Sequence, residues 1–321
     1  MPDKRRFFSS SVRLDGFMDV LILLALAGSW LGLLGSWHWA LDLFSHFRWQ
    51  YLAACVAAVI WTVLRKRRWV TLISVVTLLL NGWLVGHLMI GTGEGRVPRD
   101  QCLRVVSLNV LTSNLNKERV LAYLRGVDAD VIFLMEVNAE WMRALELLKE
   151  SHPQCLVEPR EDNFGVAMFS RLPLETVKLV DLGEAGVPSI EARLKYRERD
   201  MVILGTHPLP PTGAVYAAER DSQLRSVAAH VAGLSMPALV IGDLNSTPWS
   251  HGMRLIKADG KLDLGSASNV AMPTWKVGTV LAIPIDHALC SAPLRITRKT
   301  VAPDVGSDHR PLEVEVRWAP K

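Results

Sequence analysis

Cysteine is scarce in this chain, with 4 in 321 residues, which excludes a small scaffold held together by disulfides. Charged residues are scarce at one end, because the first 95 residues hold only 14 of the 68 charged side chains. Net charge is missing from the rest: residues 96–321 carry 27 basic and 27 acidic side chains, so the whole excess of +4 belongs to the first 95. The basic excess of the chain is therefore not a nucleic-acid-binding signal of this folded region, which has no net charge. Hydrophobic residues make up 50% of the chain, which excludes disorder.

Three long apolar stretches lie in the first 95 residues, together with seven of the eleven tryptophans: Phe17–Trp37, Trp49–Leu64 and Trp69–Ile90. A membrane-spanning helix needs about 20 mostly apolar residues, so the first and third stretches are long enough. The second has only 16 residues, which leaves open a re-entrant or interfacial hairpin. Three consecutive stretches without a small-residue cleavage site argue against a signal peptide or a buried core helix.

The loop charges predict an orientation. Lys4, Arg5, Arg6 and Arg13 precede the first stretch, and the turn 65–68 (RKRR) joins the second stretch to the third. Positive loops favour the cytoplasmic side, so the N-terminus and this turn are expected there. Three crossings then place everything after residue 90 outside the cytoplasm. We expect an integral protein of a bacterial inner membrane with a periplasmic or otherwise extracytoplasmic catalytic domain.

A Gly-, Pro- and charge-rich segment, Gly91–Asp100, predicts a boundary between a membrane anchor at 1–95 and a second domain at 96–321. About 220 residues are enough for one domain with a large core. Cys102, Cys155 and Cys290 lie in this second part without the spacing of a metal site, and we expect them to be unpaired core residues.

Short apolar runs alternate with helical patterns after residue 100. The predicted strands are 103–110, 130–137, 165–170, 175–180, 189–196, 201–207, 238–245, 284–291 and 311–318, and the predicted helices are 117–127, 139–149 and 217–234. The alternation in 189–196 (SIEARLKY) fits a strand with one face in water. Some neighbouring strands are separated by helices and others are not. This mixture predicts an α/β domain with mixed sheets.

Polar side chains recur at or beside the ends of these apolar strands, where burial should select against them. They are Asn109, Glu136, His207, Asp243, Asn245, Asp286, His287, Asp308 and His309. Each alone could be a turn or a capping residue. Together they favour a functional site, because α/β sheets place their sites at the carboxyl ends of strands.

The order of six short motifs, LNV, MEV, GTH, GDLN, IDH and SDH, resembles the endonuclease/exonuclease/phosphatase superfamily. This superfamily includes deoxyribonuclease I-like nucleases, apurinic endonucleases, inositol-polyphosphate phosphatases and neutral sphingomyelinases. The resemblance covers roughly 104–317. It implies a four-layer α/β sandwich, with two mixed sheets packed face to face and helices outside.

The resemblance also implies a metal centre. Glu136 would be the main ligand of Mg²⁺ or Mn²⁺, with help from Asn109, and Asp308 would be a second ligand. Mg²⁺ takes oxygen ligands, keeps several waters and usually binds only one or two protein carboxylates. A metal bound here would polarise the phosphoryl group.

Five residues receive catalytic roles from the same resemblance. Asp243 would orient and deprotonate the attacking water, and Asn245 would hold that water or a phosphate oxygen. His309 would face the scissile phosphate as a donor or an acid/base group. Asp286 would bind the other ring nitrogen of His309 and fix its tautomer. His207 would donate to a non-bridging oxygen in the transition state.

Departures from the family pattern give four weaker candidates for substrate binding. Many family nucleases carry a polar residue where this chain has Leu111, and Asn114 either replaces it or only caps the next helix. Asn163 is the nearest match to a mid-domain tyrosine or histidine of some members. Arg220 and Gln223 match a helix feature after the TH motif and either contact the substrate or lie on a solvated face.

The sequence therefore predicts a membrane-anchored, Mg²⁺-dependent phosphodiesterase. Its substrate would be a lipid headgroup, a nucleotide or a nucleic acid. Tethering outside the cytoplasm favours a lipid or another extracellular phosphoester, and a nuclease acting on extracytoplasmic or cellular DNA or RNA is the alternative within this class. From another class, a non-catalytic membrane-anchored binding or assembly protein could keep the same fold. Besides the bilayer, no protein partner is evident.

Overall fold

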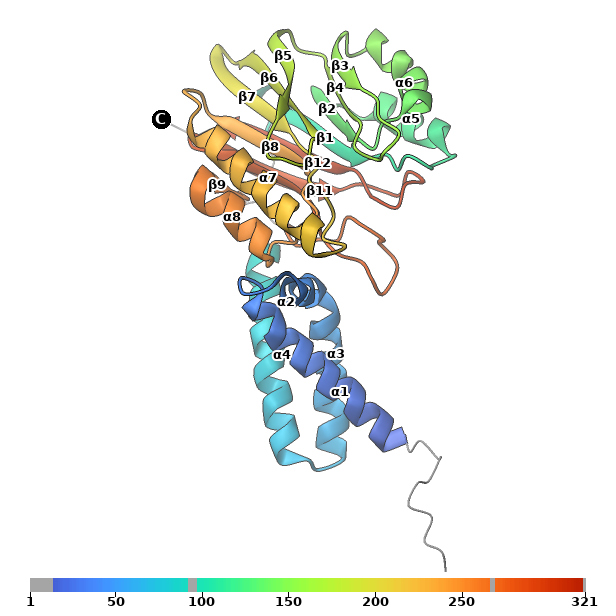
Figure 1. The fold of residues 1–321 in the computed structure, drawn as a ribbon, viewed down its shortest axis with the longest axis vertical. Coiled ribbons are helices and arrows are strands. Elements are labelled where there is room, and N and C mark those ends of the chain that lie inside the picture. Colours follow the sequence, from blue (N-terminus) through green and yellow to red (C-terminus); the bar gives the residue numbers. More distant parts are fainter. Residues whose placement is uncertain (1–13, 92–96, 266–268, 320–321) are drawn as a thin grey trace, which may run out of the picture.

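The computed structural model describes residues 14–91, 97–265 and 269–319. The predicted N-terminal positive charges and residues 92–96 of the predicted linker lie outside these ranges. Figure 1 shows two parts, a slender helical unit (residues 14–89) and a layered α/β unit (residues 103–318) seated on one end of it.

The helical unit contains the three predicted apolar stretches. Its elements are α1 (Leu14–Leu31), η1 (Gly32–Leu34), α2 (Trp39–Leu43), η2 (Phe44–Phe47), α3 (Arg48–Leu64) and α4 (Arg68–Met89). Three helical segments, at 15–34, 39–64 and 68–89, are long and apolar enough to cross a membrane. The second stretch, which is short in the sequence, reaches 26 residues because α2 and η2 precede α3.

Buried polar groups join the three long helices to one another. The Arg48 guanidinium at the start of α3 donates to the Ser29 carbonyl of α1 (2.7 Å) and to Oδ1 of Asn81 in α4 (3.3 Å). The Asn81 amide donates in turn to the Ser29 hydroxyl (2.7 Å). Between apolar helices in a low-dielectric surrounding, such hydrogen bonds fix how the helices pack.

The α/β unit consists of two six-stranded mixed sheets. The first has the order β11 (Leu294–Val301), β12 (Leu312–Trp318), β1 (Leu103–Asn109), β2 (Val131–Met135), β4 (Val166–Ser170) and β3 (Gln154–Glu158). The second has the order β5 (Leu174–Asp181), β6 (Pro188–Tyr196), β7 (Arg199–Gly205), β8 (Ala238–Asp243), β10 (Asp286–Ser291) and β9 (Leu262–Asp263). In each sheet one pair is parallel, β1 with β2 and β7 with β8, and the other pairs are antiparallel.

The two sheets pack face to face, and helices cover their outer faces. Phe133 and Ile241 belong to the core between the sheets. Helices α5 (Lys117–Gly126) and α6 (Ala139–Leu145) cover the first sheet, and α7 (Ala214–Ala232) and α8 (His251–Gly260) cover the second. Strands buried on both faces are hydrophobic almost throughout, which explains why β1, β2 and β8 were recognisable in the sequence. The predicted four-layer sandwich is confirmed.

One face predicted to lie in water is covered. Glu191 of β6 is 0% exposed because His230 of α7 packs over it, with its Nε2 2.6 Å from the carboxylate. Lys178 and Arg193 add ion pairs to the same carboxylate. The polar residues of the alternating segment 189–196 therefore include a glutamate that forms a buried ion pair under a helix, although the pattern predicted a face in water. Among the described strands and α-helices of the α/β unit, four were not predicted: β3, β9, β11 and α8.

The helical unit and the α/β unit are joined by a buried ion pair. Asp42 of α2 is 2% exposed and Arg220 of α7 is 1% exposed, and Nη2 of the arginine lies 3.1 Å from Oδ2 of the aspartate. The other oxygen of Asp42 accepts the backbone N–H of His251 at the start of α8 (2.7 Å). The two units therefore meet through a specific contact that excludes water.

Tryptophan and glutamine side chains complete this junction. The Trp49 indole donates to the Ala271 carbonyl (2.8 Å), and the Trp249 indole donates to the Leu84 carbonyl in α4 (2.8 Å). Gln50 donates to two carbonyls of the loop before β10. Each unit thus contributes donors and acceptors, which fixes the position of one against the other.

Candidate active site

Five polar side chains meet where β1, β2, β7, β8 and β10 come together. Asn109 ends β1 and Glu136 follows β2, a parallel pair whose carboxyl ends lie at one edge of the first sheet. His207 follows β7 and Asp243 ends β8, the parallel pair of the second sheet. Asp286 begins β10 directly opposite Asp243 in the antiparallel register. The fold therefore brings side chains from both sheets to a common edge.

Three residues at this edge have left-handed backbone conformations. Leu111, Glu136 and Asn245 have φ values of +60°, +62° and +46°. Asparagine tolerates this region, but leucine and glutamate lose about 1–2 kcal/mol each in it. Gly242 (φ +151°) is required for packing, because a Cβ there would lie 2.0 Å from the Thr206 carbonyl oxygen. Backbone strain concentrated at one edge is typical of functional sites.

The Glu136 carboxylate is held by two donors. Asn109 Nδ2 lies 2.8 Å from Oε1, and the Thr112 backbone N–H donates to Oε2 at 3.0 Å. Asn109 Oδ1 accepts the Leu111 N–H (3.0 Å), so the asparagine is fixed beside Glu136. Its role as a helping metal ligand stays a prediction.

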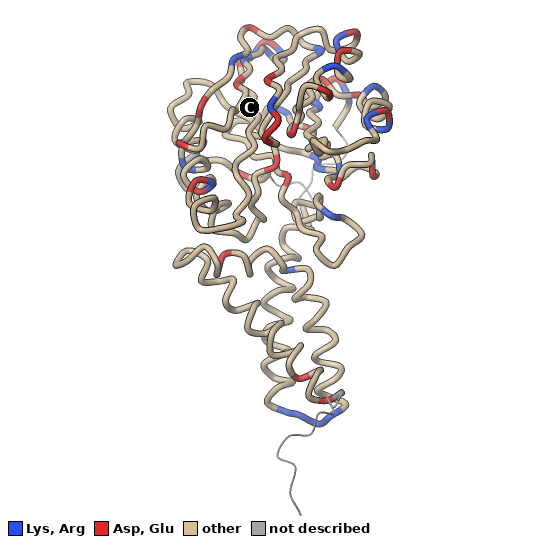
Figure 2. Tube along the Cα trace, turned by 45° about the vertical axis from the view of Figure 1, so that its right-hand side comes forward, with Lys and Arg blue, Asp and Glu red and all other residues tan. Residues whose placement is uncertain are grey.

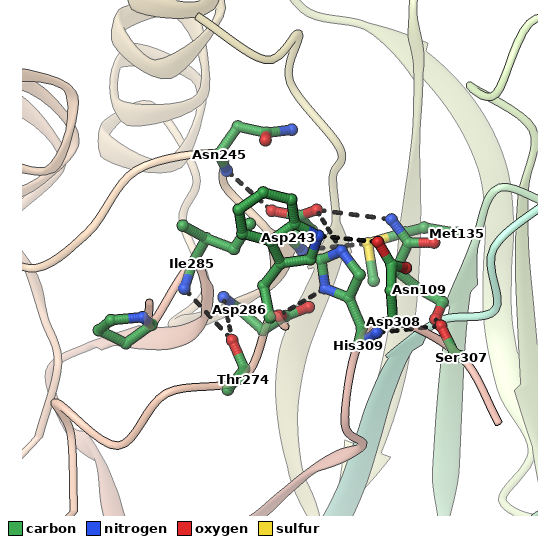
Figure 3. Close-up of polar contacts among 12 residues, drawn as sticks. Asn109, Met135, Asp243, Asn245, Thr274, Ile285, Asp286, Ser307, Asp308 and His309 are labelled. Carbon is green, nitrogen blue, oxygen red and sulfur yellow. Dashed lines mark hydrogen bonds and ion pairs between the residues drawn. The ribbon is translucent and has the colours of Figure 1, made fainter. Parts of the chain in front are cut away.

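Two histidines flank one carboxylate oxygen. His207 Nε2 and His309 Nε2 each lie 3.6 Å from Oδ2 of Asp243, while Oδ1 accepts the Asn245 N–H (2.9 Å). Behind His309, its Nδ1 lies 2.9 Å from Oδ2 of Asp286, which is completely buried (Figure 3). This places an ordered Asp–His pair against a second carboxylate, with the Nε2 atoms of both histidines near the same oxygen of that carboxylate.

The charge of His309 follows from its neighbours. Burial alone would lower the pKa of the imidazole, but Asp286 and Asp243 outweigh burial and raise it to about 10. Burial alone would raise the pKa of the Asp286 carboxyl, and the contact with His309 lowers it instead. At neutral pH the pair is therefore an imidazolium held by a carboxylate. His287 next in the chain differs, because burial lowers its pKa to about 3 and its Nε2 binds the backbone carbonyls of Ser246 and Pro284.

The donor set fits a hard divalent cation. Glu136 and Asp308 both line the same cavity. One oxygen of Asp308 accepts the Trp275 indole N–H (2.8 Å), and the other is buried with no partner among the described residues. Two carboxylates on one cavity, one of them with an unpartnered oxygen, match what Mg²⁺ uses in proteins. Asp243, Asp286 and His309 also form a group whose ligand atoms lie within 4.8 Å, but there Asp286 already holds the His309 ring.

These side chains line a cavity of about 590 Å³. Its polar residues include Glu136, Asn163, His207, Asp243, Asn245, Asp308 and His309. Its other walls are apolar or aromatic and include Phe164, Tyr216, Trp275, Ile283 and Ile285. A concave site with a few convergent polar groups on apolar walls is typical of small-ligand binding.

Three predicted substrate-binding residues lie elsewhere. Arg220 does not line the cavity; its guanidinium binds Asp42 and Asp221, and it reaches the site only through the Asn245 carbonyl (3.3 Å). Gln223 is completely buried and donates to Thr206. Asn114 is also buried, where it donates to the Val110 carbonyl and accepts the Asn116 N–H ahead of α5.

Sequence reasoning missed several residues of the site. The Thr112 hydroxyl donates to the Glu136 carbonyl, and the Thr274 hydroxyl accepts the Asp286 N–H (3.1 Å). Trp275 binds Asp308. A polar residue soon after β1 was a usable signal for Thr112. Thr274 and Trp275 lie in an irregular loop, where no periodic pattern marks them.

Comparisons with known proteins agree with this geometry. The sequence model of the Endonuclease/Exonuclease/phosphatase family matches residues 106–309. Similar solved structures include an endonuclease/exonuclease/phosphatase from Beutenbergia cavernae (22% identity, TM-score 0.57, covering 68% of this chain and 72% of that one). They also include the catalytic domain of human Nocturnin with bound sulfate (19%, 0.56, 68% and 95%) and Sphingomyelinase C from Streptomyces griseocarneus (18%, 0.54, 68% and 99%). At these identities the structures show the fold alone. No curated protein is significantly similar in sequence.

Proposed function

Because the chain belongs to the endonuclease/exonuclease/phosphatase family, we propose that it is a membrane-anchored, divalent-metal-dependent phosphodiesterase. One observation carries the proposal: the buried Asp286–His309 pair faces Asp243 in the cavity that Glu136 also lines. An acid, a base and a metal carboxylate around one cavity are the parts that in-line attack on a phosphodiester requires.

Each polar residue of the cavity has its own role in the proposed reaction. Asp243 accepts a proton from the attacking water, and Asn245 helps to hold that water. His309, protonated at neutral pH, presents its Nε2 hydrogen to the leaving oxygen, while Asp286 keeps the ring oriented. His207 donates to a non-bridging oxygen, where negative charge grows in the transition state. Water oxygen thus bonds to phosphorus as the bond to the leaving oxygen breaks.

Glu136 and Asp308 would hold the cation, with Mg²⁺ or Mn²⁺ as its identity. When bound, the metal would neutralise charge on the phosphoryl oxygens. Asn109 and Thr112 orient Glu136 for this purpose, in the way that outer hydrogen bonds commonly fix metal ligands.

The proposed arrangement has residues 1–95 as anchor and 96–321 as catalytic domain, with the N-terminus in the cytoplasm of a bacterium and the catalytic domain outside. Figure 2 supports this orientation, because the 65–68 turn lies at the end of the helical unit away from the α/β unit. A positive turn favours the cytoplasmic side. A reporter that is active only in the cytoplasm, fused after Lys321, should stay silent, whereas a strong signal would reverse the orientation.

Hydrolysis of bis-p-nitrophenyl phosphate by the purified full chain tests the activity. We expect turnover that a chelator removes and Mg²⁺ or Mn²⁺ restores. Glu136→Gln should lower kcat at least roughly hundredfold. Glu140→Gln is the matched control, because Glu140 is an exposed glutamate paired with Lys117 outside the cavity. Absence of turnover in the wild type would favour the non-catalytic alternative, and equal rates in the two variants would show that the assignment of Glu136 is wrong.

A further inference from the structure

The helical unit supplies part of the catalytic cavity. Leu43, at the end of α2, and His46 and Phe47, in η2, line the same cavity as Glu136 and His309. All three precede residue 106, where the family match begins. They are held against the α/β unit by the Asp42–Arg220 pair, so the wall they form belongs to the same fixed junction.

Two kinds of side chain line the cavity. Carboxylates and imidazoles are one kind, and apolar or aromatic side chains, including Leu43, Phe47, Tyr216 and Ile283, are the other. A phosphate alone has no use for the apolar kind. A ligand that contacts both kinds carries an apolar group beside its phosphoester.

His46 lies in this wall without a partner. Its side chain is 5% exposed, and neither ring nitrogen has a hydrogen-bond partner among the described residues. Leaving a buried polar group unpaired costs about 1–3 kcal/mol. A hydrogen bond to a polar atom of a ligand bound in the cavity would remove that cost.

The cavity lies at the level expected for lipid headgroups. Helix α4 has 22 residues, or about 33 Å at 1.5 Å per residue, close to the thickness of a bilayer's hydrocarbon core. The start of the neighbouring helix α3 adjoins the cavity wall, because Gln50 donates to the Val280 and Ala282 carbonyls, directly before Ile283 of the lining. Val280 is 83% exposed, and exposed Tyr216 lies at the start of α7. Exposed apolar side chains beside spanning helices favour contact with the membrane surface.

We propose that the substrate is a phosphodiester with a long hydrocarbon chain, that is, a membrane lipid, and that the helical unit forms its binding wall. The phosphate lies beside Glu136 and His309, the start of the chain lies against Leu43 and Phe47, and His46 donates a hydrogen bond to a polar atom next to the phosphate. This inference rests on the proposed phosphodiesterase activity.

A series of alkyl p-nitrophenyl phosphates with methyl, octyl and hexadecyl chains tests the apolar wall, using the full chain in detergent micelles. In each hydrolysis, water bonds to phosphorus, p-nitrophenolate leaves, and the alkyl monophosphate remains. Wild type should show kcat/KM rising with chain length. Partitioning of long esters into micelles is the same for every variant, so the decisive quantity is the hexadecyl-to-methyl ratio of kcat/KM compared between variants.

Phe47→Ala should lower that ratio by roughly tenfold or more, the effect of losing the apolar contact of one large side chain. Phe44→Ala is the matched control: it lies in the same 3-10 turn but outside the cavity lining, and its ratio should stay at the wild-type value. Leu43→Ala provides a second variant if Phe47→Ala does not fold. Wild-type ratios in both cavity variants would overturn the inference.

The role of His46 is tested with two substitutions, one that removes its hydrogen-bond donor and one that keeps a donor. His46→Phe should raise KM for the octyl ester by roughly threefold to tenfold, whereas His46→Gln should recover most of it. Equal KM values in both variants and the wild type would remove His46 from the binding site. A wild type active on the methyl ester but indifferent to chain length refutes the lipid inference alone. A wild type inactive on every ester refutes the proposed function itself.

Discussion

The Asp42–Arg220 pair gives the sharpest prediction about how the two units depend on each other. In the Arg220→Leu variant, Asp42 would keep its bonds from His251 and Ser45 but lose its only ion-pair partner among the described residues. Removing one member of a buried ion pair typically costs about 3–5 kcal/mol. The reverse change, Asp42→Asn, should cost less, about 1–3 kcal/mol, because Arg220 keeps its contacts with Asp221.

Thermal unfolding of the purified full chain measures both changes. At roughly 2–4 °C per kcal/mol, Arg220→Leu should lower the Tm by roughly 6–20 °C and Asp42→Asn by less. The double variant should lose clearly less than the sum of the single losses. Glu140→Gln, which removes an exposed pair with Lys117, should change little and serves as the control. Additive losses within about 0.5 kcal/mol would show that the pair is not coupled and would refute the reasoning.

Three further predictions concern the α/β unit. Asp286→Asn should lower kcat about 10²–10⁴-fold with a smaller change in KM, because His309 loses the carboxylate that orients it. Steady-state kinetics measures both constants, and an unchanged kcat would exclude the pair from catalysis. Lys299→Met should stabilise the protein by up to about 3 kcal/mol at pH 7, because burial lowers the lysine pKa from 10.5 to about 8. Below pH 8 this cost is constant, and it disappears as the pH rises to 10.5, so urea midpoints should rise over that interval in the wild type but not in the variant. Gly242→Ala should both destabilise the fold and lower activity, since its Cβ would collide with the Thr206 carbonyl; normal urea midpoints would contradict the packing described above.

The fold could be predicted where strands are buried on both faces. The runs that became β1, β2 and β8 are nearly continuous in apolar residues, and they carry the site at their ends. The elements that were not predicted have weaker signals. Strands β3, β9 and β11 lie at sheet edges, and β11 (LRITRKTV) holds three basic residues and two threonines among its eight. A strand with few apolar residues resembles a loop in sequence.

The site could be predicted only where its residues belong to the six motifs that follow the family's order. Glu136, Asp243, Asp286 and His309 lie at or beside the ends of strands that the pattern already located. Arg220 could not be placed in the same way, because its partner belongs to a helix 178 residues earlier in the chain. His46 could not be predicted for the same reason. Its position in the cavity depends on how the helical unit packs against the α/β unit, and no local sequence pattern indicates that packing.

The most direct test of the proposed chemistry is a titration of the full chain with Mn²⁺, followed by electron paramagnetic resonance. The metal is assigned to Glu136 and Asp308, and Asp286 is assigned to His309. Asp286→Asn should therefore bind Mn²⁺ with nearly wild-type affinity despite its low kcat. Glu136→Gln should lose about tenfold or more in affinity. Normal Mn²⁺ affinity in Glu136→Gln, together with loss of binding in Asp286→Asn, would place the metal among Asp243, Asp286 and His309 and contradict the mechanism.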